Sequence, residues 1–299
     1  MRILVTGGTG FIGSNLVLEL MKGGHEIIIT GHDAEQKIPG FKGKYLQSSL
    51  IGIDWQAIPK IDVLFHSAAI NDTAHMDREE MFRANVLSSK ELFRHVTEKG
   101  CRRIVYASST AVYGNTPVPY KEDGPFELLN PYAESKKALD EFAAEFSKQH
   151  PEVRVVGLRY CNVYGPRENH KGKRATMIYQ LAHQTKSGNP KLFKFGEQKR
   201  DYIYVKDAVR ANLLAAEAKE SCIVNCGFGR ATSFNHIVKI LNKTLGSNRT
   251  PEYFDNPNPE NYQSHTECDM TLAKEKLGFV PEFDIERGIA DYHQSGFLV

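Results

Sequence analysis

Short apolar runs recur along the first part of the chain, and stretches with helical spacing of apolar residues separate them. The runs that indicate buried strands are 2–5, 25–30, 61–65, 103–107 and 153–159. Apolar positions three or four residues apart indicate helices at 14–22, 79–99 and 132–147. Because parallel strands joined by helices take right-handed crossovers, this alternation predicts the α/β class with a doubly wound parallel sheet.

Three glycines lie between the first strand and the first helix. They are Gly7, Gly10 and Gly13, and Phe11 and Ile12 open the helical pattern. Glycines at this spacing let the chain turn tightly and approach a pyrophosphate, while free N–H groups at the helix start point at the anion. This arrangement at the start of a βαβ pattern predicts a Rossmann domain that binds a dinucleotide through these five residues.

The end of the second strand bears on which dinucleotide fits. An acidic residue there binds the ribose hydroxyls and repels a 2′-phosphate. This chain has Gly31 at that position, followed by His32 and Asp33, and Lys37 lies further along. We therefore predict NADP as the cofactor, with NAD as the alternative, and Gly31 and His32 as cofactor contacts. An ordinary turn at these residues is the other interpretation.

Residues near other strand ends complete the predicted cofactor site. Ala68 and Ala69 follow the strand at 61–65, where small side chains let the backbone lie against a cofactor. Asn85 belongs to the next helix and is predicted to face the cofactor. The remaining predicted cofactor contacts are Ser49, Leu50 and Val163.

A tyrosine, a lysine and a serine supply candidate chemistry. Tyr132 and Lys136 are four residues apart, so both side chains leave one face of a helix. An ammonium beside a phenol favours the phenolate and lowers its pKa, which makes the pair a usable acid or base. Ser109 follows the strand at 103–107, at the edge where parallel sheets bind ligands. For the tyrosine and lysine alone, chance spacing is the simpler alternative.

Composition argues against several other classes. The chain has 299 residues, 41% of them apolar, which is enough to bury a large core. A net charge of +2 requires neither a nucleic acid nor an anionic membrane as partner. No apolar run approaches the ~18 residues of a membrane span, and Met1 leads into the first strand without a signal-peptide pattern, which predicts a cytoplasmic protein. Five scattered cysteines predict reduced packing thiols and no metal site.

Four motifs together resemble the extended short-chain dehydrogenase/reductase family of nucleotide-sugar epimerases and dehydratases. They are the glycine turn, Ser109 before Val112-Tyr113-Gly114, Tyr132-x-x-x-Lys136, and the segment 159–166. The resemblance covers essentially the whole chain and implies that a hydride moves between a sugar carbon and a nicotinamide. It implies that Tyr132 is the acid/base, that Lys136 orients Tyr132 and the nicotinamide ribose, and that Ser109 polarises the reacting oxygen.

The segment after Pro166 is similar to an Arg-Glu-Gly-His-Lys-Gly segment of ADP-glycero-manno-heptose 6-epimerases. The resemblance implies that Lys171 is a second acid/base opposite Tyr132. Inversion of a carbon requires the hydride to leave one face and return to the other, so the intermediate carbonyl must turn over between two proton-transfer groups. Burial beside another cation would let a lysine lose its proton near neutral pH. A solvated basic loop is the alternative for Lys171.

The same resemblance implies substrate contacts further along the chain. Arg200 would hold the diphosphate through its fork of donors, and Tyr262 would contact the nucleotide sugar. The predicted substrate-binding residues are Asn162, Lys173, Gln180, Phe193, Arg200 and Tyr262. The chain departs from the heptose epimerases on the substrate side at Asn169, Lys173, Gln180 and Asn261.

These patterns predict two regions and one class of activity. Residues 1–160, rejoined by 200–228, form the NAD(P)-binding Rossmann domain, and 161–199 with 229–299 form a smaller α/β region that binds the nucleotide sugar. We predict a nucleotide-sugar epimerase that is a cytoplasmic homo-oligomer. A UDP-hexose 4-epimerase, another nucleotide-sugar dehydratase or reductase, and a non-catalytic dinucleotide-binding regulator remain alternatives. Thr110-Ala111 does not supply the acidic pair that a 4,6-dehydratase usually has after the serine.

Overall fold

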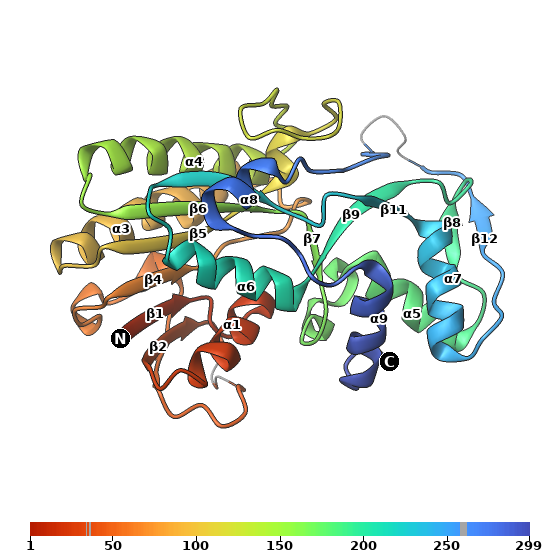
Figure 1. Ribbon diagram of the computed structural model, residues 1–299, viewed down its shortest axis with the longest axis horizontal. Helices are drawn as coiled ribbons and strands as arrows, with labels where there is room; N and C mark the ends of the chain where they lie inside the picture. Colours follow the sequence, from red (N-terminus) through yellow and green to blue (C-terminus); the bar gives the residue numbers. More distant parts are fainter. Residues whose placement is uncertain (34, 36, 258–261) are drawn as a thin grey trace.

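The computed structural model describes residues 1–33, 35, 37–257 and 262–299. Within these ranges the largest sheet has seven strands in the order β10-β6-β5-β4-β1-β2-β3 (Figure 1). Their bounds are β1 Arg2–Thr6, β2 Glu26–Gly31, β3 Lys44–Gln47, β4 Val63–His66, β5 Arg103–Ser109, β6 Arg154–Tyr160 and β10 Cys222–Cys226. All neighbours pair in parallel, and the order runs outward from β1 in both directions. The predicted doubly wound fold is confirmed.

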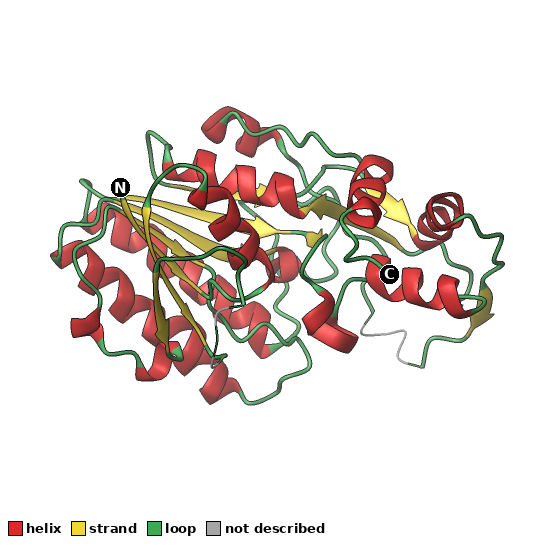
Figure 2. Cartoon of the chain, turned by 90° about the horizontal axis from the view of Figure 1, so that it is seen from below, coloured by secondary structure: helices red, strands yellow, loops and turns green. Residues whose placement is uncertain are grey.

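Helices cover both faces of this sheet (Figure 2). They include α1 (Phe11–Met21), α3 (Ser88–Glu98), α4 (Pro131–Gln149) and α6 (Val205–Ala216). Ile3 and Val5 of β1 belong to the core under α1 and α6, whereas Leu4 between them belongs to the core under α3 and α4. The continuous apolar run of β1 therefore serves two cores, one on each face of the sheet.

The helix α4 begins where its sequence supplies a cap. The side chain of Asn130 accepts a hydrogen bond from the N–H of Ala133 at 2.9 Å, and Pro131 occupies the first helical position. Both features favour a helix start at this residue. Tyr132 and Lys136 are thereby fixed in the first turns of a 19-residue helix.

The single helix predicted at 79–99 is interrupted. The structure has α2 (Arg78–Phe82), a π-helical turn η3 (Arg83–Leu87) and then α3. Asn85 lies in the π turn, and Asp77 caps α2 through a hydrogen bond to the N–H of Glu80. Such π turns often occur at functional sites. The buried residues Met81 and Val86 are five residues apart, a spacing that fits this turn and that the prediction of one continuous helix overlooked.

A second, smaller region carries the rest of the chain. One sheet has the order β11-β9-β7, and another pairs β12 with β8. The strands are β7 Asn162–Tyr164, β8 Lys191–Phe193, β9 Lys199–Tyr204, β11 Ala231–Ser233 and β12 Glu252–Phe254, and the helices are α5 Met177–Ser187, α7 Phe234–Leu245 and α9 Ile285–Gln294. Helix α8 (Thr271–Leu277) packs instead against β10 and α6, beside the large sheet. The later strand β10 returns to the large sheet beside β6. In the described part of the chain, no helix combines the length and the apolar character needed to cross a membrane.

Candidate active site

Ser109, Tyr132 and Lys136 come together at the carboxyl end of β5. Ser109 is the last residue of that strand, and its Oγ accepts a hydrogen bond from the N–H of Ala111 at 3.1 Å, which caps the short turn η4 (Thr110–Tyr113). A hydrogen bond joins the side chains of Ser109 and Tyr132. The Lys136 ammonium lies 5.7 Å from the centre of the Tyr132 ring and donates to the carbonyl of Ala107 at 2.8 Å.

Burial controls the proton affinities of this group. It raises the pKa of Tyr132, and the hydrogen bond from Ser109 offsets that only in part. The net shift of the pKa of Tyr132 is therefore upward, because desolvation of the phenolate is the larger effect, and the predicted lowering of this pKa by Lys136 stays a prediction. Burial lowers the pKa of Lys136 to about 8, against the opposing effect of Asp140. Burial also lowers the pKa of His66 to about 3, and Lys136 adds to this effect.

A buried ion pair fixes α4 against β6. Asp140, one turn after Lys136, accepts from Arg159 Nε at 2.8 Å and from the Tyr106 hydroxyl at 2.9 Å. Arg159 also donates to the Tyr113 hydroxyl at 2.8 Å. Both partners of the ion pair are almost fully buried. Loss of either partner would leave an uncompensated buried charge, so this pair holds the catalytic helix in one position.

The glycine turn after β1 has the shape that a dinucleotide requires. Gly7 has φ +65°, and a Cβ there would lie 2.8 Å from the N atom of Ala68. A Cβ on Gly13 would lie 2.2 Å from the carbonyl of Gly7, so the helix packs directly on the turn. Gly10 caps α1 with no side-chain hydrogen bond, which leaves the N–H groups of the first turn to an anion. These residues fit a nicotinamide dinucleotide.

The end of β2 shows why Gly31 lacks a side chain. A Cβ on Gly31 would lie 2.3 Å from Oγ1 of Thr9, so Thr9 fills the space that an acidic residue would need. The Thr30 hydroxyl accepts from the N–H of Gly7 at 3.2 Å, which joins β2 to the glycine turn. His32 follows as an exposed residue. Sequence reasoning missed Thr9, and the glycine at position 31 was the signal for a neighbour of this kind.

Asn85 organises the backbone after β4. Its side chain accepts from the N–H of Ile70 at 2.8 Å, donates to the carbonyl of the same residue at 2.9 Å, and donates to Ser135 on α4 at 3.1 Å. Asn85 therefore holds the segment that contains Ala68 and Ala69 beside the catalytic helix. Its predicted direct contact with the cofactor remains a prediction.

The other predicted cofactor residues follow β3 or lie in β7. Ser49 follows β3, and the N–H of the preceding Ser48 donates to the carbonyl of Gly31 at 2.9 Å. Val163 is buried in β7, next to the carboxyl end of β6. For Leu50 and Lys173 the description covers the backbone alone, so their predicted roles stay predictions. Asn261 lies outside the described residues.

Lys171 lies on a loop that packs against the glycine turn. It belongs to η5 (Asn169–Arg174), and its ammonium is 5.4 Å from the centre of the Phe11 ring. The buried carboxylate of Glu168 fixes this loop by accepting from the N–H of Gly165 at 3.1 Å and the N–H of Thr176 at 2.7 Å. Burial lowers the pKa of Lys171, and Glu168 opposes that shift. The described contacts join Lys171 to the cofactor turn rather than to Tyr132.

Three predicted substrate residues form one cluster. The Arg200 guanidinium lies 5.1 Å from the centre of the Tyr262 ring, and that ring meets Phe193 edge-on at 5.3 Å. Asn162 donates from its side chain to the carbonyl of Asp201 at 2.9 Å, next to Arg200 in β9. Gln180 lies apart from this cluster in the contacts described, and its side chain donates to the carbonyl of Ala175 at 2.7 Å.

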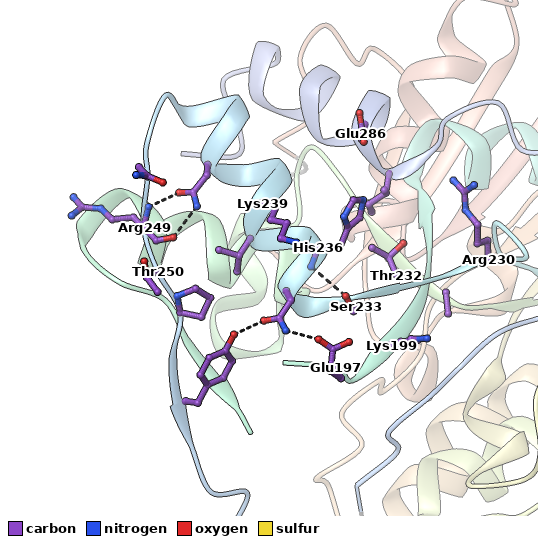
Figure 3. Close-up of a pocket in the computed structure, with 18 residues that line it drawn as sticks. Glu197, Lys199, Arg230, Thr232, Ser233, His236, Lys239, Arg249, Thr250 and Glu286 are labelled. Atoms are coloured by element: carbon purple, nitrogen blue, oxygen red, sulfur yellow. Dashed lines mark hydrogen bonds between the residues drawn. The ribbon is translucent and has the colours of Figure 1, made fainter. Parts of the chain in front are cut away.

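A hollow of about 1050 Å³ in the smaller region contains none of the predicted site residues (Figure 3). The basic residues that line it are Lys199, Arg230, His236, Lys239 and Arg249. Figure 3 places Arg230 and Arg249 at opposite ends of α7, so the positive charges do not converge on one point. The hollow is a solvated face of the smaller region.

Cys161, Asp201 and Cys268 bring three potential metal ligands within 4.8 Å of one another. Both oxygens of Asp201 are already in use, because they accept from the N–H groups of Phe228 at 2.8 Å, Gly229 at 3.0 Å and Cys268 at 3.1 Å. Burial raises the pKa of both thiols, which keeps them neutral. The contacts are those of a packed polar core.

Comparison with known proteins places the chain in a family. The model of the NAD dependent epimerase/dehydratase family matches residues 3–227. The chain therefore belongs to the NAD-dependent epimerase/dehydratase family. The predicted family and the predicted enzyme class, an NAD(P)-dependent nucleotide-sugar epimerase, are confirmed.

Individual epimerases and related enzymes are similar to the chain over nearly its whole length. The chain is 36% identical to the ADP-L-glycero-D-manno-heptose-6-epimerase of Alkalilimnicola ehrlichii, over 97% of this chain and 96% of the relative. The crystal structure of the Helicobacter pylori ADP-L-glycero-D-manno-heptose-6-epimerase matches with a TM-score of 0.90 at 33% identity, over 98% of this chain and 95% of that one. The structure of MoeE5 in complex with UDP-glucose and NAD matches with a TM-score of 0.87 at 28% identity, over 99% of each chain.

Proposed function

We propose that this enzyme inverts the glycero carbon of an ADP-glycero-manno-heptose through a transient ketone. The observation that carries the proposal is the convergence of Ser109, Tyr132 and Lys136 beside a dinucleotide turn, with Lys171 packed on the same turn. The two heptose epimerases among the relatives support the choice of sugar.

Each group has a role that its surroundings support. Tyr132 exchanges a proton with the sugar hydroxyl, and Ser109, hydrogen-bonded to the phenol, polarises the same oxygen. Lys136, anchored on Ala107, supplies positive charge beside the phenol. Lys171 exchanges the proton on the opposite side of the ketone after it turns over. A bound nicotinamide ring supplies the acceptor and donor of the hydride.

For the cofactor we propose NAD rather than the NADP that the sequence favoured. The family description and the NAD-bound MoeE5 structure support NAD. The prediction of NADP depended on Gly31, and in the structure this glycine makes room for Thr9. Denaturing the purified protein and identifying the released nucleotide by mass tests this point. Release of NADP alone would contradict it.

We also propose the predicted division of labour between the regions and a cytoplasmic homo-oligomer. The glycine turn, Ser109 and Tyr132 belong to the part organised by the large sheet, and the cluster of Arg200, Tyr262 and Phe193 belongs to the smaller region. Light scattering of the purified protein measures the oligomeric state, and a monomeric mass would contradict that prediction.

The decisive experiment is an assay of purified protein with both C6 epimers of ADP-glycero-manno-heptose. We expect either epimer to give the same mixture, with no net consumption of cofactor. A matched panel of UDP-hexoses tests the 4-epimerase alternative. Inversion of a UDP-hexose in place of the heptose would overturn the proposed substrate, and no reaction with any sugar would favour a non-catalytic regulator.

A further inference from the structure

Arg167 has an unusual backbone and no role in the site described above. It follows Pro166 after β7, and its φ is +75°. Among the described residues other than glycine, only Lys37 also has a positive φ, at +45°. L-residues rarely adopt this conformation, and it persists where the surrounding structure fixes it.

The two residues with this conformation are in contact. The Arg167 guanidinium donates to the carbonyl of Lys37 at 3.1 Å and to the hydroxyl of Ser14 in α1 at 2.8 Å. The side chain of Asn15 donates to the carbonyl of Pro166 at 2.9 Å. These bonds join the loop after β7 to the dinucleotide-binding helix and to the segment after β2.

The same loop continues to Lys171. Glu168 fixes its base through the N–H of Gly165 at 3.1 Å, and Lys171 ends beside Phe11. Residues 165–171 therefore lie along the first turns of α1, and Arg167 makes the contacts in the middle of the segment.

The charge of Arg167 is unusual for this place. A cation beside the N-terminal turns of a helix is repelled by the helix dipole unless an anion lies between them. The guanidinium is partly buried, burial lowers its pKa, and no carboxylate among the described residues forms an ion pair with it. An anion at the start of α1 would satisfy both the helix and the guanidinium.

We propose that Arg167 binds the diphosphate side of the cofactor while it holds residues 165–171 against the first turns of α1, and that it thereby positions Lys171 at the site. The inference rests on the proposed cofactor. Occupancy of the glycine turn and the position of Lys171 are then coupled through one side chain.

Cofactor affinity measured without any sugar tests this inference. The probes are NAD and NADP, titrated by calorimetry into protein stripped of nucleotide. We expect Arg167→Ala to weaken binding of the natural cofactor by at least about tenfold, and Arg167→Lys, which keeps the charge but loses the fork, to fall between it and the wild type. Arg174→Ala is the matched control, because Arg174 is on the same loop, is exposed and pairs with Asp72 at 3.8 Å. Its affinity should stay within about twofold.

Limited trypsin digestion gives the second readout. In the wild type, cofactor should protect the peptide bonds after Lys171 and Arg174 from cleavage. In Arg174→Ala it should protect the bond after Lys171. In Arg167→Ala it should protect neither bond. Equal affinity and equal protection in Arg167→Ala would overturn the inference. If Arg167→Ala does not fold, equal affinity of Arg167→Lys and the wild type would overturn it as well. Loss of cofactor by Arg167→Ala in a protein that epimerises no sugar would sink the proposed function and leave this inference standing.

Discussion

The two proposed proton-transfer groups are held in different ways. Tyr132 lies in a 19-residue helix that Asn130 caps and that the buried Asp140–Arg159 pair fixes to β6. Lys171 lies in a six-residue turn, and Gly172 within that turn has φ 55° and ψ −125°. One group is placed by regular secondary structure, and the other by side-chain contacts of a loop.

This difference predicts different behaviour. Helical spacing alone brings Tyr132 and Lys136 to one face, so their geometry survives loss of any single peripheral contact. The position of Lys171 depends on the hydrogen bonds of Glu168 and Arg167, and a loop with few contacts opens more easily than a packed helix. We therefore expect binding of cofactor and sugar to change the position of Lys171 more than that of Tyr132.

The largest effect is expected at Tyr132. Tyr132→Phe removes the transferable proton and leaves α4 intact, so turnover should fall by about 10²–10⁴-fold while cofactor content stays equal to that of the wild type. The measurements are the rate of epimerisation and the nucleotide released on denaturation. Tyr253→Phe is the control, because its hydroxyl donates to Asn235 at 2.9 Å on the surface of the smaller region. Unchanged turnover in Tyr132→Phe would remove this residue from the mechanism.

Lys171→Ala should separate the two halves of the reaction. We expect epimerisation to slow by about 10²-fold, because the second face of the ketone loses its proton donor. Formation of reduced nicotinamide in a single turnover should slow much less, since Tyr132 remains. Stopped-flow absorbance and product analysis measure the two steps, with Lys186→Ala at the exposed end of α5 as control. Equal slowing of both steps would make Lys171 a structural loop residue.

The comparison also explains what the sequence could predict. Continuous apolar runs and period-3.6 patterns with glycine signals predicted most strands of the large sheet, Ser109 at a strand end and the Tyr132–Lys136 pair. The π turn at Asn85 was missed although the buried residues Met81 and Val86 are five residues apart, which is the spacing of a π turn rather than of an α-helix. Strand β3 and helix α9 were also missed, because β3 is a partly exposed edge strand with only two apolar residues and α9 follows a stretch without a strong signal.

Loop contacts were the other gap. Nothing in the local pattern around Glu168 says that its carboxylate is buried and bonded to Gly165 and Thr176, because those partners become neighbours only in the folded chain. The resemblance to known epimerases supplied Lys171, whereas the spacing of residues supplied Tyr132. The contrast follows from the difference between periodic elements and loops.

Glu168→Gln tests whether these contacts hold the loop. The carboxylate is fully buried and accepts three hydrogen bonds, two from Thr176 and one from Gly165. An amide turns one acceptor into a donor that faces an N–H group, so the free energy of unfolding should fall by about 1–3 kcal/mol. Urea unfolding measures the change, and Glu286→Gln, exposed in the first turn of α9, should change it by less than about 0.5 kcal/mol. Equal stability of the two variants would mean that other contacts hold the loop.

The smallest effect concerns pH and the helical side of the site. Because burial lowers the pKa of Lys136 to about 8, the residue loses its ammonium charge as pH rises through that value. The phenolate of Tyr132 then loses its neighbouring cation, and turnover should decline above about pH 8. Stability moves the opposite way: the unfolded chain binds more protons than the folded one between about 8 and the usual ~10.4 of lysine, so this group's contribution to stability rises with pH in that window.

The dependence of turnover on pH in Lys136→Arg shows whether Lys136 or another group that titrates near pH 8 causes the decline. Arginine keeps its charge throughout, so the decline should move to higher pH even if geometry lowers the absolute rate. Lys137→Arg is the matched control, because Lys137 is next in sequence and pairs with Glu141 on the outer side of α4. Its profile should follow the wild type. A decline that stays near pH 8 in Lys136→Arg would assign it to another group, with Lys171 on the adjustable loop as the next candidate, because burial lowers the pKa of that lysine too.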